Sequence, residues 1–551
     1  MKMKLAWSCL VLSCIVMTSR VRGEVFTALA DMEALLETEG MLLDSLHSYV
    51  RYQEDRLRLL KKQYEEYNSE HRTAMADVSD YLSNPINAFK IIKRLSSNWM
   101  DTEKVMENDP GASFVKNMTR MKEVLKFPSE EDLSGAAAAL VRLQDLYRLD
   151  TAEVAQGLLN GIKYSAPMSA HDCFELGRQT YNLGDYEHTE LWMTEALTKH
   201  DLEPNKTVPK SEILEYLAFS SYMTGNVDSA LTLTNELLEI VPDHSRARGN
   251  IPHYEKALKE NKENEKDIGT SLPLPSKREV ERNVYEDLCR EELELPEAIK
   301  KTLKCRYFSD THPFLRLAPL KLEEQYLDPY IVVFHDILFE NEMNFIKEFA
   351  KPRFKRATVQ DSETGELVHA KYRISKSAWL KDHEHRVVAA VTRRVADLTG
   401  LSMDSAEELQ VANYGIGGHY EPHFDFARKE EKHAFGGDTG IGNRIATVLF
   451  YMTDVAQGGN TVFPELGLSL KPKKGMGVFW LNLFPSGEGN FATRHAACPV
   501  LQGSKWVSNK WIHQMGQELL QPCTLEFQEE GMRSGFPKPV PVKKPALATD
   551  G

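Results

Sequence analysis

The chain has 551 residues, 42% hydrophobic and 27% charged, enough for three or four folded domains. Its formal net charge is −14 at pH 7. This acidic balance argues against nucleic acid as a partner, because binding to phosphates requires a basic surface. Beyond the first residues, no apolar run approaches the ~18 residues that a membrane-spanning helix needs, so no membrane span is expected.

The first segment, Met1–Gly23, has two lysines, the apolar run Leu5–Met17 and then small and polar residues. This pattern predicts a secretory signal peptide at 1–23, too short to span a bilayer. Two sequons, at Asn117 and Asn205, predict glycosylation and fit passage through a lumenal compartment.

Two of the seven cysteines lie in the signal segment, which leaves five in the mature chain. In a compartment that permits disulfides, the local spacing predicts two pairs, Cys289 with Cys305 and Cys498 with Cys523. Cys173 lies in a helical pattern and is expected to be a buried free thiol. A structural zinc site is the alternative, but the chain has no C-x2-C motif.

Residues 24–160 are expected to form a helical N-terminal domain. Apolar residues recur at heptad spacing from Leu29, which predicts a coiled coil and self-association. One seam holds Leu29, Leu36, Leu43, Val50, Leu57 and Tyr64, and the other holds Met32, Leu46, Leu60 and Tyr67. The alternative is an ordinary amphipathic helix packed on its own domain. Residues 71–160 continue as mostly helical.

Residues 161–262 are expected to form a second helical domain. Within it, two similar helix–turn–helix units carry turns at 182–186 and 224–228 and show tetratricopeptide-like spacing. Their aromatic residues recur at helical spacing, which is typical of a core. Polyproline II chains nevertheless dock on aromatic-lined grooves, so we expect a peptide groove that uses Tyr181, Tyr216 and Tyr222.

The stretch Lys259–Arg282 is charged and lacks aromatic residues, so it is expected to be a linker. The connecting segment is assigned to residues 263–327, which hold one cysteine pair. After Cys523 the tail 524–551 is rich in proline and is expected to be disordered. It carries no retention signal of the lysine-aspartate-glutamate-leucine type.

The stretch 411–513 carries the chemistry. It holds His423 and Asp425 two residues apart, a downstream His495, and Lys505. Two imidazoles and one carboxylate suit non-haem Fe(II) with open positions, and a lysine can bind the far carboxylate of a 2-oxo acid. An H-x-[DE] match is weak evidence by itself, because four occur in the chain, and His419 with Glu421 is a rival.

The surroundings of this motif strengthen the interpretation. His423-Phe-Asp425-Phe alternates as a strand does, and three strand-like runs follow at Ile445–Met452, Gly477–Leu483 and Lys505–Ile512. Gly-rich turns lie between them, so the region is expected to be antiparallel β structure.

These residues and their surroundings resemble those of a known enzyme family. From about Asp328 to Cys523 the chain resembles the 2-oxoglutarate, Fe(II)-dependent dioxygenases, and as a whole it is similar to the α-subunit family of collagen prolyl 4-hydroxylases. The motifs that carry the resemblance are YEPHFDFARK, GNRIAT, TVFPE, LNLFPSGEG and TRHAACPVL with KWVSNKW. It implies a multidomain chain: an all-α half, with coiled-coil and tetratricopeptide-like domains, and then an α+β double-stranded β-helix (jelly-roll) catalytic domain at 328–523.

The resemblance also implies residue roles. It makes His423, Asp425 and His495 the iron ligands and Lys505 the partner of the C5 carboxylate of 2-oxoglutarate, with Tyr414 and Thr461 as helpers. It places Tyr420, Arg444 and Trp511 beside the peptide. The alternatives are that Tyr420 and Trp511 are core aromatics and that Arg444 is a structural ion-pair partner.

The implied activity is hydroxylation of C4 of proline in X-Pro-Gly repeats of procollagen, with Fe(II), O2, 2-oxoglutarate and L-ascorbate, giving succinate and CO2. The implied setting is the endoplasmic reticulum lumen, in an α2β2 assembly with a protein disulfide isomerase β subunit and with homodimerisation through the N-terminal coiled coil.

Two other hypotheses remain. One is an inactive interaction scaffold, against which the intact His423, Asp425, His495 and Lys505 set argues. The other is a dioxygenase with a different target, either collagen lysine or a proline of a signalling protein. Lys505 in place of arginine, together with the aromatic repeat module, disfavours collagen lysine, and the signal peptide disfavours a cytosolic sensor.

Overall fold

The computed structural model describes residues 24–107, 111–125, 127–264, 277–360, 366–370, 372–429, 431, 440–524 and 542–543. The chain divides into two compact units. One comprises residues 31–128, and the other comprises the remaining described residues, from 24 to 30 and from 129 onward. The predicted signal peptide 1–23 and almost all of the predicted tail lie outside the described residues.

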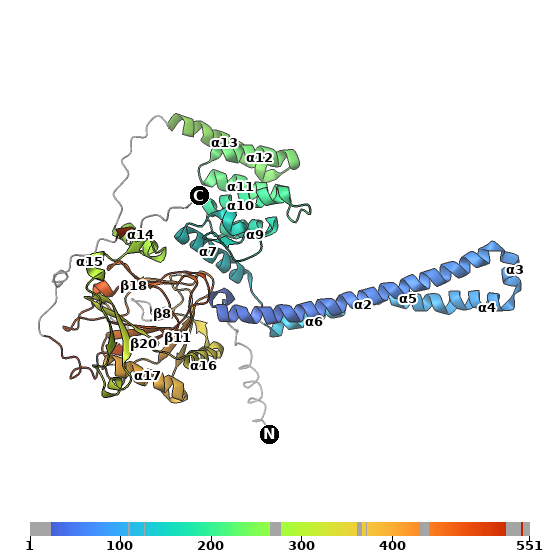
Figure 1. Cartoon of the computed structure of the whole chain (residues 1–551). Coiled ribbons are helices and arrows are strands. Elements are labelled where there is room, and N and C mark those ends of the chain that lie inside the picture. Colours follow the sequence, from blue (N-terminus) through green and yellow to red (C-terminus); the bar gives the residue numbers. More distant parts are fainter. Residues whose placement is uncertain are drawn as a thin grey trace, which may run out of the picture. The chain divides into compact units, whose positions relative to one another are not determined.

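The 31–128 unit is a helical hairpin (Figure 1). Its long arm is α2, Leu29–Ala76, so the heptad stretch is helical as predicted. The chain returns through α3 (Val78–Ser83), α4 (Pro85–Lys93), α5 (Trp99–Glu107) and α6 (Gly111–Val124). The ring of Tyr67 lies 5.4 Å from that of Trp99, and Tyr49 lies 5.2 Å from Phe114. These contacts hold α5 and α6 antiparallel to α2.

This packing leaves one predicted heptad seam exposed. The side chains of Leu36, Leu43, Val50, Leu57 and Tyr64 are 43–71% exposed within the chain. Exposed apolar residues in one helical row mark a surface that can bind another apolar surface. Whether a second copy covers this row stays a prediction.

In the other unit, five helices form the repeat module: α9 (Ala170–Asn182), α10 (Tyr186–Leu202), α11 (Lys210–Met223), α12 (Val227–Ile240) and α13 (Ser245–Asn264). Figure 1 shows them stacked in chain order. Gly184 and Gly225 form the turns within the first and second helix pairs with φ of 79° and 91°, backbone conformations that favour glycine. The predicted helix–turn–helix units are therefore present, and a fifth helix follows them.

Helix α7, Glu130–Tyr147, belongs to the same compact unit as the β domain, although we expected residues up to 160 to form part of the N-terminal domain. Its buried residues explain this division. Ala137 packs against the repeat module, and Leu143, Leu146 and Tyr147 pack against the β domain. α8 (Thr151–Ala155) and a small hairpin, β1 (Leu158–Leu159) with β2 (Ile162–Lys163), lead from α7 to the repeats.

The β domain is built on two sheets. The larger has nine strands in the order β4-β5-β6-β17-β13-β20-β11-β10-β7, and the smaller has four in the order β12-β18-β15-β16. The strands of the large sheet are Cys305–Phe308, Leu320–Leu327, Tyr330–His335, Gly477–Leu481, Arg444–Tyr451, Trp506–His513, Leu409–Asn413, Lys376–Leu380 and Lys355–Arg356. Those of the small sheet are Tyr420–His423, His495–Ala497, Thr461–Phe463 and Leu468–Leu470.

Three of the predicted strands are confirmed as β13, β17 and β20, with ends that differ by one or two residues. The fourth differs, because β12 ends at His423 and Asp425 lies in the bend that follows. All the pairings of both sheets are antiparallel, as expected.

Alternation along the strands separates two cores. On β6, Val332 and Phe334 pack in one cluster with α16 (Glu340–Ala350) and α17 (Arg386–Thr399), which cover the outside of the large sheet. Ile331 and Val333 pack in the other cluster, with residues of the small sheet. Since successive side chains of a strand point to opposite faces, the inner face of the large sheet looks toward the small sheet, as in a jelly roll.

The connecting segment is structured where it is described. It holds α14 (Lys277–Cys289), the short strand β3 (Leu293–Glu294), α15 (Glu297–Lys300) and β4. Helix α13 runs on to Asn264, so the expected linker is helical at both ends, and its middle lies outside the described residues. In the predicted tail, Val542–Lys543 form β21, which pairs with β3.

The predicted disulfides are wrong. Cys289 pairs with Cys498, with the two Cα atoms 5.5 Å apart, and Cys305 and Cys523 are free and exposed. The end of α14 packs Cys289 into the same buried cluster as Cys498, and spacing along the chain does not encode that contact. Cys173 is a buried free cysteine, as predicted.

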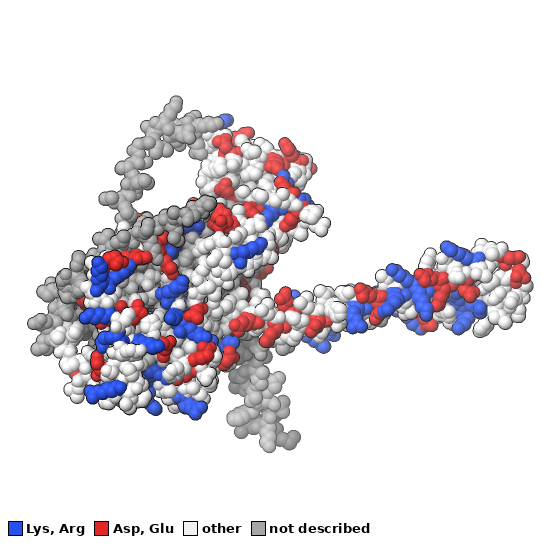
Figure 2. Space-filling model, viewed as in Figure 1, with Lys and Arg blue, Asp and Glu red and all other residues white. Residues whose placement is uncertain are grey.

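Within the described residues, no helix combines the length and the apolar character that crossing a membrane requires. The remaining short pairs are β14 (Gln457–Gly458) with β19 (Val500–Gln502) and β8 (Val359–Gln360) with β9 (Leu367–Val368). On the face shown in Figure 2, basic and acidic side chains are interspersed over the described parts of both units.

Candidate active site

His423, Asp425 and His495 converge at one edge of the small sheet. His423 ends β12 and faces His495, which begins β18, across the antiparallel pair. Asp425 follows in the bend after β12. One ligand atom from each residue lies within 4.8 Å of the other two, and the described residues contain no other cluster of three such side chains. The structure therefore brings together the three predicted ligands.

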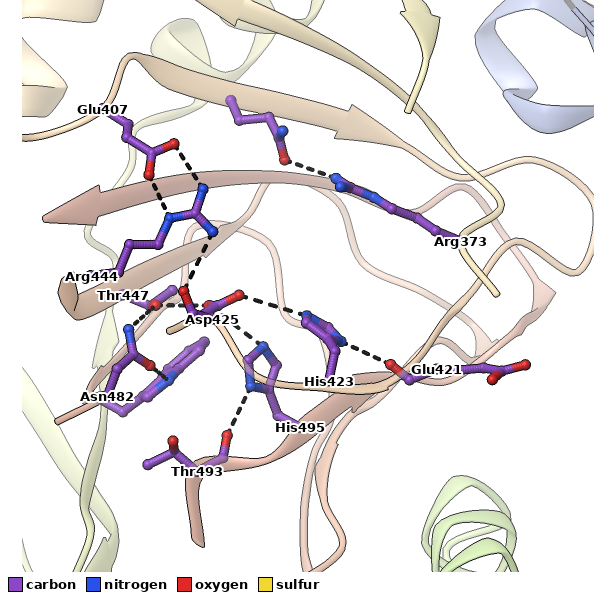
Figure 3. A network of polar contacts seen from close by, with 12 residues as sticks. Arg373, Glu407, Glu421, His423, Asp425, Arg444, Thr447, Asn482, Thr493 and His495 are labelled. Atoms are coloured by element: carbon purple, nitrogen blue, oxygen red, sulfur yellow. Dashed lines mark hydrogen bonds and ion pairs between the residues drawn. The ribbon is translucent and has the colours of Figure 1, made fainter. Parts of the chain in front are cut away.

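Backbone carbonyls orient both imidazoles (Figure 3). Nδ1 of His423 lies 2.8 Å from the carbonyl oxygen of Glu421, and Nδ1 of His495 lies 2.9 Å from that of Thr493. Because a carbonyl oxygen only accepts, each Nδ1 donates, which leaves Nε2 as the ring atom that can bind a metal. Both Nε2 atoms face the Asp425 carboxylate at 3.6 Å. This arrangement is typical of metal-binding histidines.

A chain of hydrogen bonds orients the carboxylate. The hydroxyl of Thr447 donates to Oδ2 of Asp425 at 2.8 Å, Nδ2 of Asn482 donates to that hydroxyl oxygen at 2.9 Å, and Nε1 of Trp480 donates to Oδ1 of Asn482 at 2.8 Å. All four side chains are buried. Thr447 lies on β13 and Trp480 on β17, both strands of the large sheet. The large sheet therefore orients the carboxylate of Asp425, a predicted ligand that comes after β12 of the small sheet.

The protonation states also suit a metal. Burial lowers the pKa of His495 to about 4, so its imidazole is neutral at pH 7. Burial alone would raise the pKa of Asp425, but His495 and His423 outweigh it and hold the carboxyl well below its usual range. Two imidazoles, that of His495 neutral, and one ionised carboxylate fit Fe(II).

A β-bulge brings Tyr420 beside His423. The register of β12 shifts between these two residues, and the ring of Tyr420 stacks on the His423 ring at 3.5 Å between centroids. In a regular strand, residues three apart would point to opposite faces. The rival His419 is buried and is not part of the cluster, and its Nδ1 lies 3.2 Å from the carbonyl oxygen of Gly417.

A cavity of about 500 Å³ is lined by His423 and Asp425, two of the three predicted ligands. Tyr420, Arg444 and Trp511, the three residues predicted to lie on the peptide side, all line it. The guanidinium of Arg444 lies 4.0 Å from the centre of the Trp511 ring. Nε1 of Trp511 is buried without a hydrogen-bond partner among the described residues, so this donor is left for a ligand.

Arg444 is held by a carboxylate that the sequence did not single out. Glu407 accepts from Nε and Nη2 of Arg444 at 2.5 and 2.9 Å (Figure 3). Its Oε1 also lies 2.9 Å from Nε2 of His513. Arg444 and His513 together hold the pKa of Glu407 below its usual value, against the effect of burial. Arg444 therefore has the ion-pair partner that the alternative predicted, and both residues line the cavity. The role of Arg444 beside the peptide stays a prediction.

Two further lining residues, Arg373 and Trp379, come from the segment around β10. The guanidinium of Arg373 lies 4.8 Å from the Tyr420 ring centre, and the ring of Trp379 lies 5.9 Å from that of Trp511. No motif marked these residues, although the pairing of β10 with β11 at the edge of the large sheet carries them toward the site.

Lys505, Tyr414 and Thr461 do not line this cavity; they lie in the space between the two sheets. Lys505 precedes β20 and is 1% exposed. Its ammonium lies 5.0 Å from the Tyr414 ring centre, and no acidic side chain pairs with it among the described residues. Burial lowers its pKa from 10.5 to about 7. Thr461 accepts a hydrogen bond from the Tyr451 hydroxyl at 2.6 Å.

The repeat module holds a smaller cavity of about 120 Å³. Tyr181 and Tyr216, with ring centres 4.9 Å apart, line it together with Phe219, Arg246 and Asn250. Tyr222 is not among the lining residues, because its ring stacks on Tyr254 at 4.5 Å in another cluster. The structure thus brings together two of the three tyrosines predicted for the groove.

Comparisons with known proteins place this site in a class. Residues 409–513, which contain the three predicted ligands and Lys505, match the model of the 2OG-Fe(II) oxygenase superfamily. Residues 28–161 match the prolyl 4-hydroxylase alpha-subunit N-terminal region, and residues 170–260 match the prolyl 4-hydroxylase peptide-substrate-binding domain. The fold and the site therefore define a 2-oxoglutarate, Fe(II)-dependent oxygenase.

Full-length relatives narrow the class. The chain is 46% identical to prolyl 4-hydroxylase subunit alpha-1 of Homo sapiens over 95% of its own length and 100% of the relative's. It is 49% identical to subunit alpha-2 of Caenorhabditis elegans over 92% and 94%. The chain belongs to the prolyl 4-hydroxylase α-subunit family and is a prolyl 4-dioxygenase.

Solved structures include a viral collagen prolyl hydroxylase from Paramecium Bursaria Chlorella virus-1 in complex with 2OG. It is 24% identical, the match covers 34% of this chain and 96% of that one, and the TM-score is 0.28.

Proposed function

We propose that this chain is the catalytic α subunit that hydroxylates C4 of proline in X-Pro-Gly repeats of procollagen, with L-ascorbate keeping the iron reduced. The observation that carries the proposal is the cluster of His423, Asp425 and His495, two of which, His423 and Asp425, line a cavity with aromatic walls. In such enzymes Fe(II), 2-oxoglutarate and O2 together supply the oxidant for a C–H bond, and 2-oxoglutarate leaves as succinate and CO2.

In the proposed mechanism, His423, Asp425 and His495 bind the iron from one side. The backbone bonds to both Nδ1 atoms and the Thr447 hydroxyl keep the three ligand atoms in place before the metal arrives. Preorganisation of this kind limits the rearrangement needed on binding. Burial of His495 and Asp425 keeps bulk water from one side of the site.

Lys505 is proposed to bind the C5 carboxylate of 2-oxoglutarate. A buried ammonium without a carboxylate partner is costly, and it becomes favourable when a ligand carboxylate completes the pair. The hydroxyls of Tyr414 and Thr461 lie in the same inter-sheet space and are proposed to donate to that carboxylate. The distal end of the co-substrate would then lie deep between the sheets.

The cavity beside the ligands suits a proline-rich peptide. A chain in the polyproline II conformation has no internal hydrogen bonds, so its carbonyl oxygens need donors. Nε1 of Trp511 is a buried donor without a partner among the described residues, and Tyr420 and Trp511 contribute aromatic surface to the cavity wall. We therefore assign Tyr420, Arg444 and Trp511 to substrate binding.

The repeat module is proposed to hold a second part of the same substrate chain. Tyr181 and Tyr216 present an aromatic cavity, and aromatic grooves recognise polyproline II segments. Attachment at a second module raises the effective concentration of the repeats at the active site. A long repetitive substrate gains from this arrangement more than a short one.

We further propose that the chain works in the endoplasmic reticulum lumen, after removal of residues 1–23 and glycosylation at Asn117 and Asn205, both of which lie on exposed positions. The buried Cys289–Cys498 disulfide suits an oxidising compartment. The exposed row on α2 is proposed as the homodimer contact, and a protein disulfide isomerase as the β subunit of an α2β2 assembly.

The test uses the chain co-expressed with a protein disulfide isomerase. Succinate release and a one-oxygen mass gain on proline are followed with (Pro-Pro-Gly)n as the substrate, in the presence of Fe(II), 2-oxoglutarate and ascorbate. Hydroxylation at C4 that is lost in His423→Ala supports the proposal. Absence of succinate from the folded, iron-loaded complex would overturn it, as would equal turnover of proline-free peptides.

A further inference from the structure

Helix α7 lies outside the part of the chain that matches the oxygenase superfamily, yet it packs against β18, which carries the proposed iron ligand His495, and bonds to the turn before β12, which carries His423. It falls within the region that matches the N-terminal model. Leu143, Leu146 and Tyr147 share a buried cluster with Ala496 of β18 and Val462 of β15. The outer face of the small sheet is therefore covered by a helix from the N-terminal region.

Alternation along β18 separates the two faces of this sheet. Ala496 points outward, into the cluster with α7 and α14. His495 points inward, to the metal cluster. A helix that fixes the outer face of so short a strand also restricts the inner face, because successive side chains share one rigid backbone.

Two polar contacts attach α7 to the turns at one end of the β12–β18 pair. Nη1 of Arg142 donates to the carbonyl oxygen of Gly417 at 3.2 Å, just before β12. The hydroxyl of Tyr147 donates to the carbonyl oxygen of Pro499 at 2.5 Å, just after β18. The two turns are bonded to each other, since the amide of Val500 donates to the carbonyl oxygen of Gly418 at 3.2 Å.

The turn before β12 is packed so tightly that side chains are excluded. A Cβ at Gly417 would lie 2.8 Å from the carbonyl oxygen of Ala139 in α7, and a Cβ at Gly415 would lie 1.9 Å from that of Phe26. The amide of Ile416 also donates to the Phe26 carbonyl oxygen at 3.2 Å. Backbone thus meets backbone here, and α7 contacts this turn along more than one residue.

The strand pair transmits this attachment to the iron site. Tyr420 faces Ala497 at the end held by α7, and His423 faces His495 at the other end. The described pair is only a few residues long, so its register depends on what holds its ends. From these contacts we infer that Arg142 and Tyr147 are positioning residues of the iron site, which fix the separation of His423 and His495 from outside the oxygenase region. The inference rests on the proposed roles of these two histidines as iron ligands.

The other face of α7 packs against the repeat module. Oε1 of Gln144 accepts a hydrogen bond from Nε1 of Trp192 in α10 at 2.8 Å, and Ala137 packs in the core of the repeat module. One helix therefore contacts both the substrate-binding repeats and the strands of the iron site. The repeat module is anchored to the sheet that binds the metal.

The experiment compares full-length complexes that carry Tyr147→Phe, Arg142→Met or both. Tyr147→Phe removes one hydroxyl, and Arg142→Met keeps most of the side-chain stem. The Fe(II) dissociation constant is measured without oxygen, and kcat and the peptide KM are measured with iron in excess. We expect Fe(II) affinity to fall about tenfold in the double variant, the effect that loss of indirect support for ligands commonly has. Peptide binding to the repeat module should be unchanged.

Matched controls separate positioning from general stability. Tyr164→Phe deletes another hydroxyl that contacts the β domain, since it accepts a hydrogen bond from Nε2 of Gln457. Gln457 is distant in the sequence from both His423 and His495. Arg178→Met removes an ion pair with Glu175 inside the repeat module. Both should keep the wild-type Fe(II) affinity, and Arg142→Lys should restore part of what Arg142→Met loses.

Amide hydrogen exchange provides a readout that does not depend on activity. In the double variant, exchange at residues 420–423 and 495–497 should be faster, with exchange in α16 and α17 unchanged. If Fe(II) affinity and this exchange both match the wild type, the inference is overturned. If His495→Ala also keeps its Fe(II) affinity, the proposed ligand set fails instead. Where the double variant is recovered poorly, Tyr147→Phe alone decides by the same criteria.

Discussion

The hydroxyl of Thr447 donates a 2.8 Å hydrogen bond to Oδ2 of Asp425, and both side chains are almost completely buried. Thr447 lies on β13 of the large sheet, whereas Asp425 follows the last strand residue of β12 in the small sheet. The one carboxylate among the proposed ligands is therefore oriented by the opposite sheet. Asn482 and Trp480 extend this support into the core.

Thr447→Val, which replaces the hydroxyl with a methyl group of similar size, should weaken Fe(II) binding by about 10- to 100-fold, the usual effect of losing a hydrogen bond to a ligand. The buried carboxylate would lose its donor, and Nδ2 of Asn482 would lose its acceptor. Equilibrium dialysis of the oxygen-free complex measures the change. Thr447→Ser keeps the hydroxyl and should bind Fe(II) nearly as the wild type does. Equal affinities in the valine and serine variants would contradict the prediction.

The second prediction concerns Lys505 and pH. In the ligand-free chain, burial lowers its pKa from 10.5 to about 7, and only the protonated amine attracts a carboxylate. Binding of 2-oxoglutarate should therefore weaken as the pH rises above about 7, by up to about tenfold per unit while binding still requires proton uptake. Calorimetric titration from pH 6 to 9 checks this. In Lys505→Arg the dependence should be much flatter, because arginine stays charged over this range.

The buried ammonium of Lys505 should also lower the free energy of unfolding of the ligand-free chain. Its pKa is lower in the folded chain than in the unfolded chain. The loss of stability is therefore fully present below pH 7, where the amine is charged in both states, and it disappears as the pH rises from about 7 toward 10.5. Lys505→Met should raise the melting temperature of the ligand-free complex at pH 6 more than at pH 9. A larger gain at pH 9 would contradict this account.

The third prediction is that Glu407→Gln raises the peptide KM roughly tenfold, the order expected when a buried charge-assisted bond is weakened. Glu407 holds Arg444 through two bonds, and Arg444 in turn lies on the Trp511 ring. The co-substrate KM should stay unchanged, since Lys505 lies elsewhere. Glu342→Gln is the matched control, because Glu342 makes a similar two-bond pair with Arg394, away from the cavity.

The residues that form the candidate site could be predicted from the sequence more easily than the residues that hold them in position. The roles proposed for His423, Asp425, His495 and Lys505 follow from residue type and spacing, and the structure brings the first three together. Glu407 precedes β11 and contacts Arg444 at the start of β13, and this contact exists only after β11 and β13 are placed in the same sheet. Sequence spacing does not contain that information.

The cysteines show the same limit. The two pairs expected from local spacing would close short loops, but the observed bond joins residues separated by 209 positions. It forms because α14 packs on the outer face of the small sheet, which brings Cys289 to Cys498. Heptads and helix–turn–helix repeats are local patterns, and the helices that they predict are present. Packing between elements that are distant in the sequence was not predicted.

The last prediction concerns the repeat module and separates two tyrosines that the sequence could not separate. Tyr216 and Tyr222 are both half-buried on α11. Tyr216 lines the aromatic cavity with Tyr181, whereas Tyr222 stacks on Tyr254 and does not line it. Tyr216→Ala should therefore raise the KM for long (Pro-Pro-Gly)n several-fold and leave the KM for a single-triplet peptide unchanged, because only the long chain reaches both modules.

Tyr222→Ala should lower the thermal stability of the module, through loss of ring packing, without changing the ratio of the two KM values. Steady-state kinetics on both peptides, with melting curves of each variant, measure these effects. If the ratio of the KM values for the long and short peptides is the same in Tyr216→Ala and the wild type, the aromatic cavity does not bind substrate. A larger change in that ratio for Tyr222→Ala would place the groove on the Tyr254 side of α11 instead.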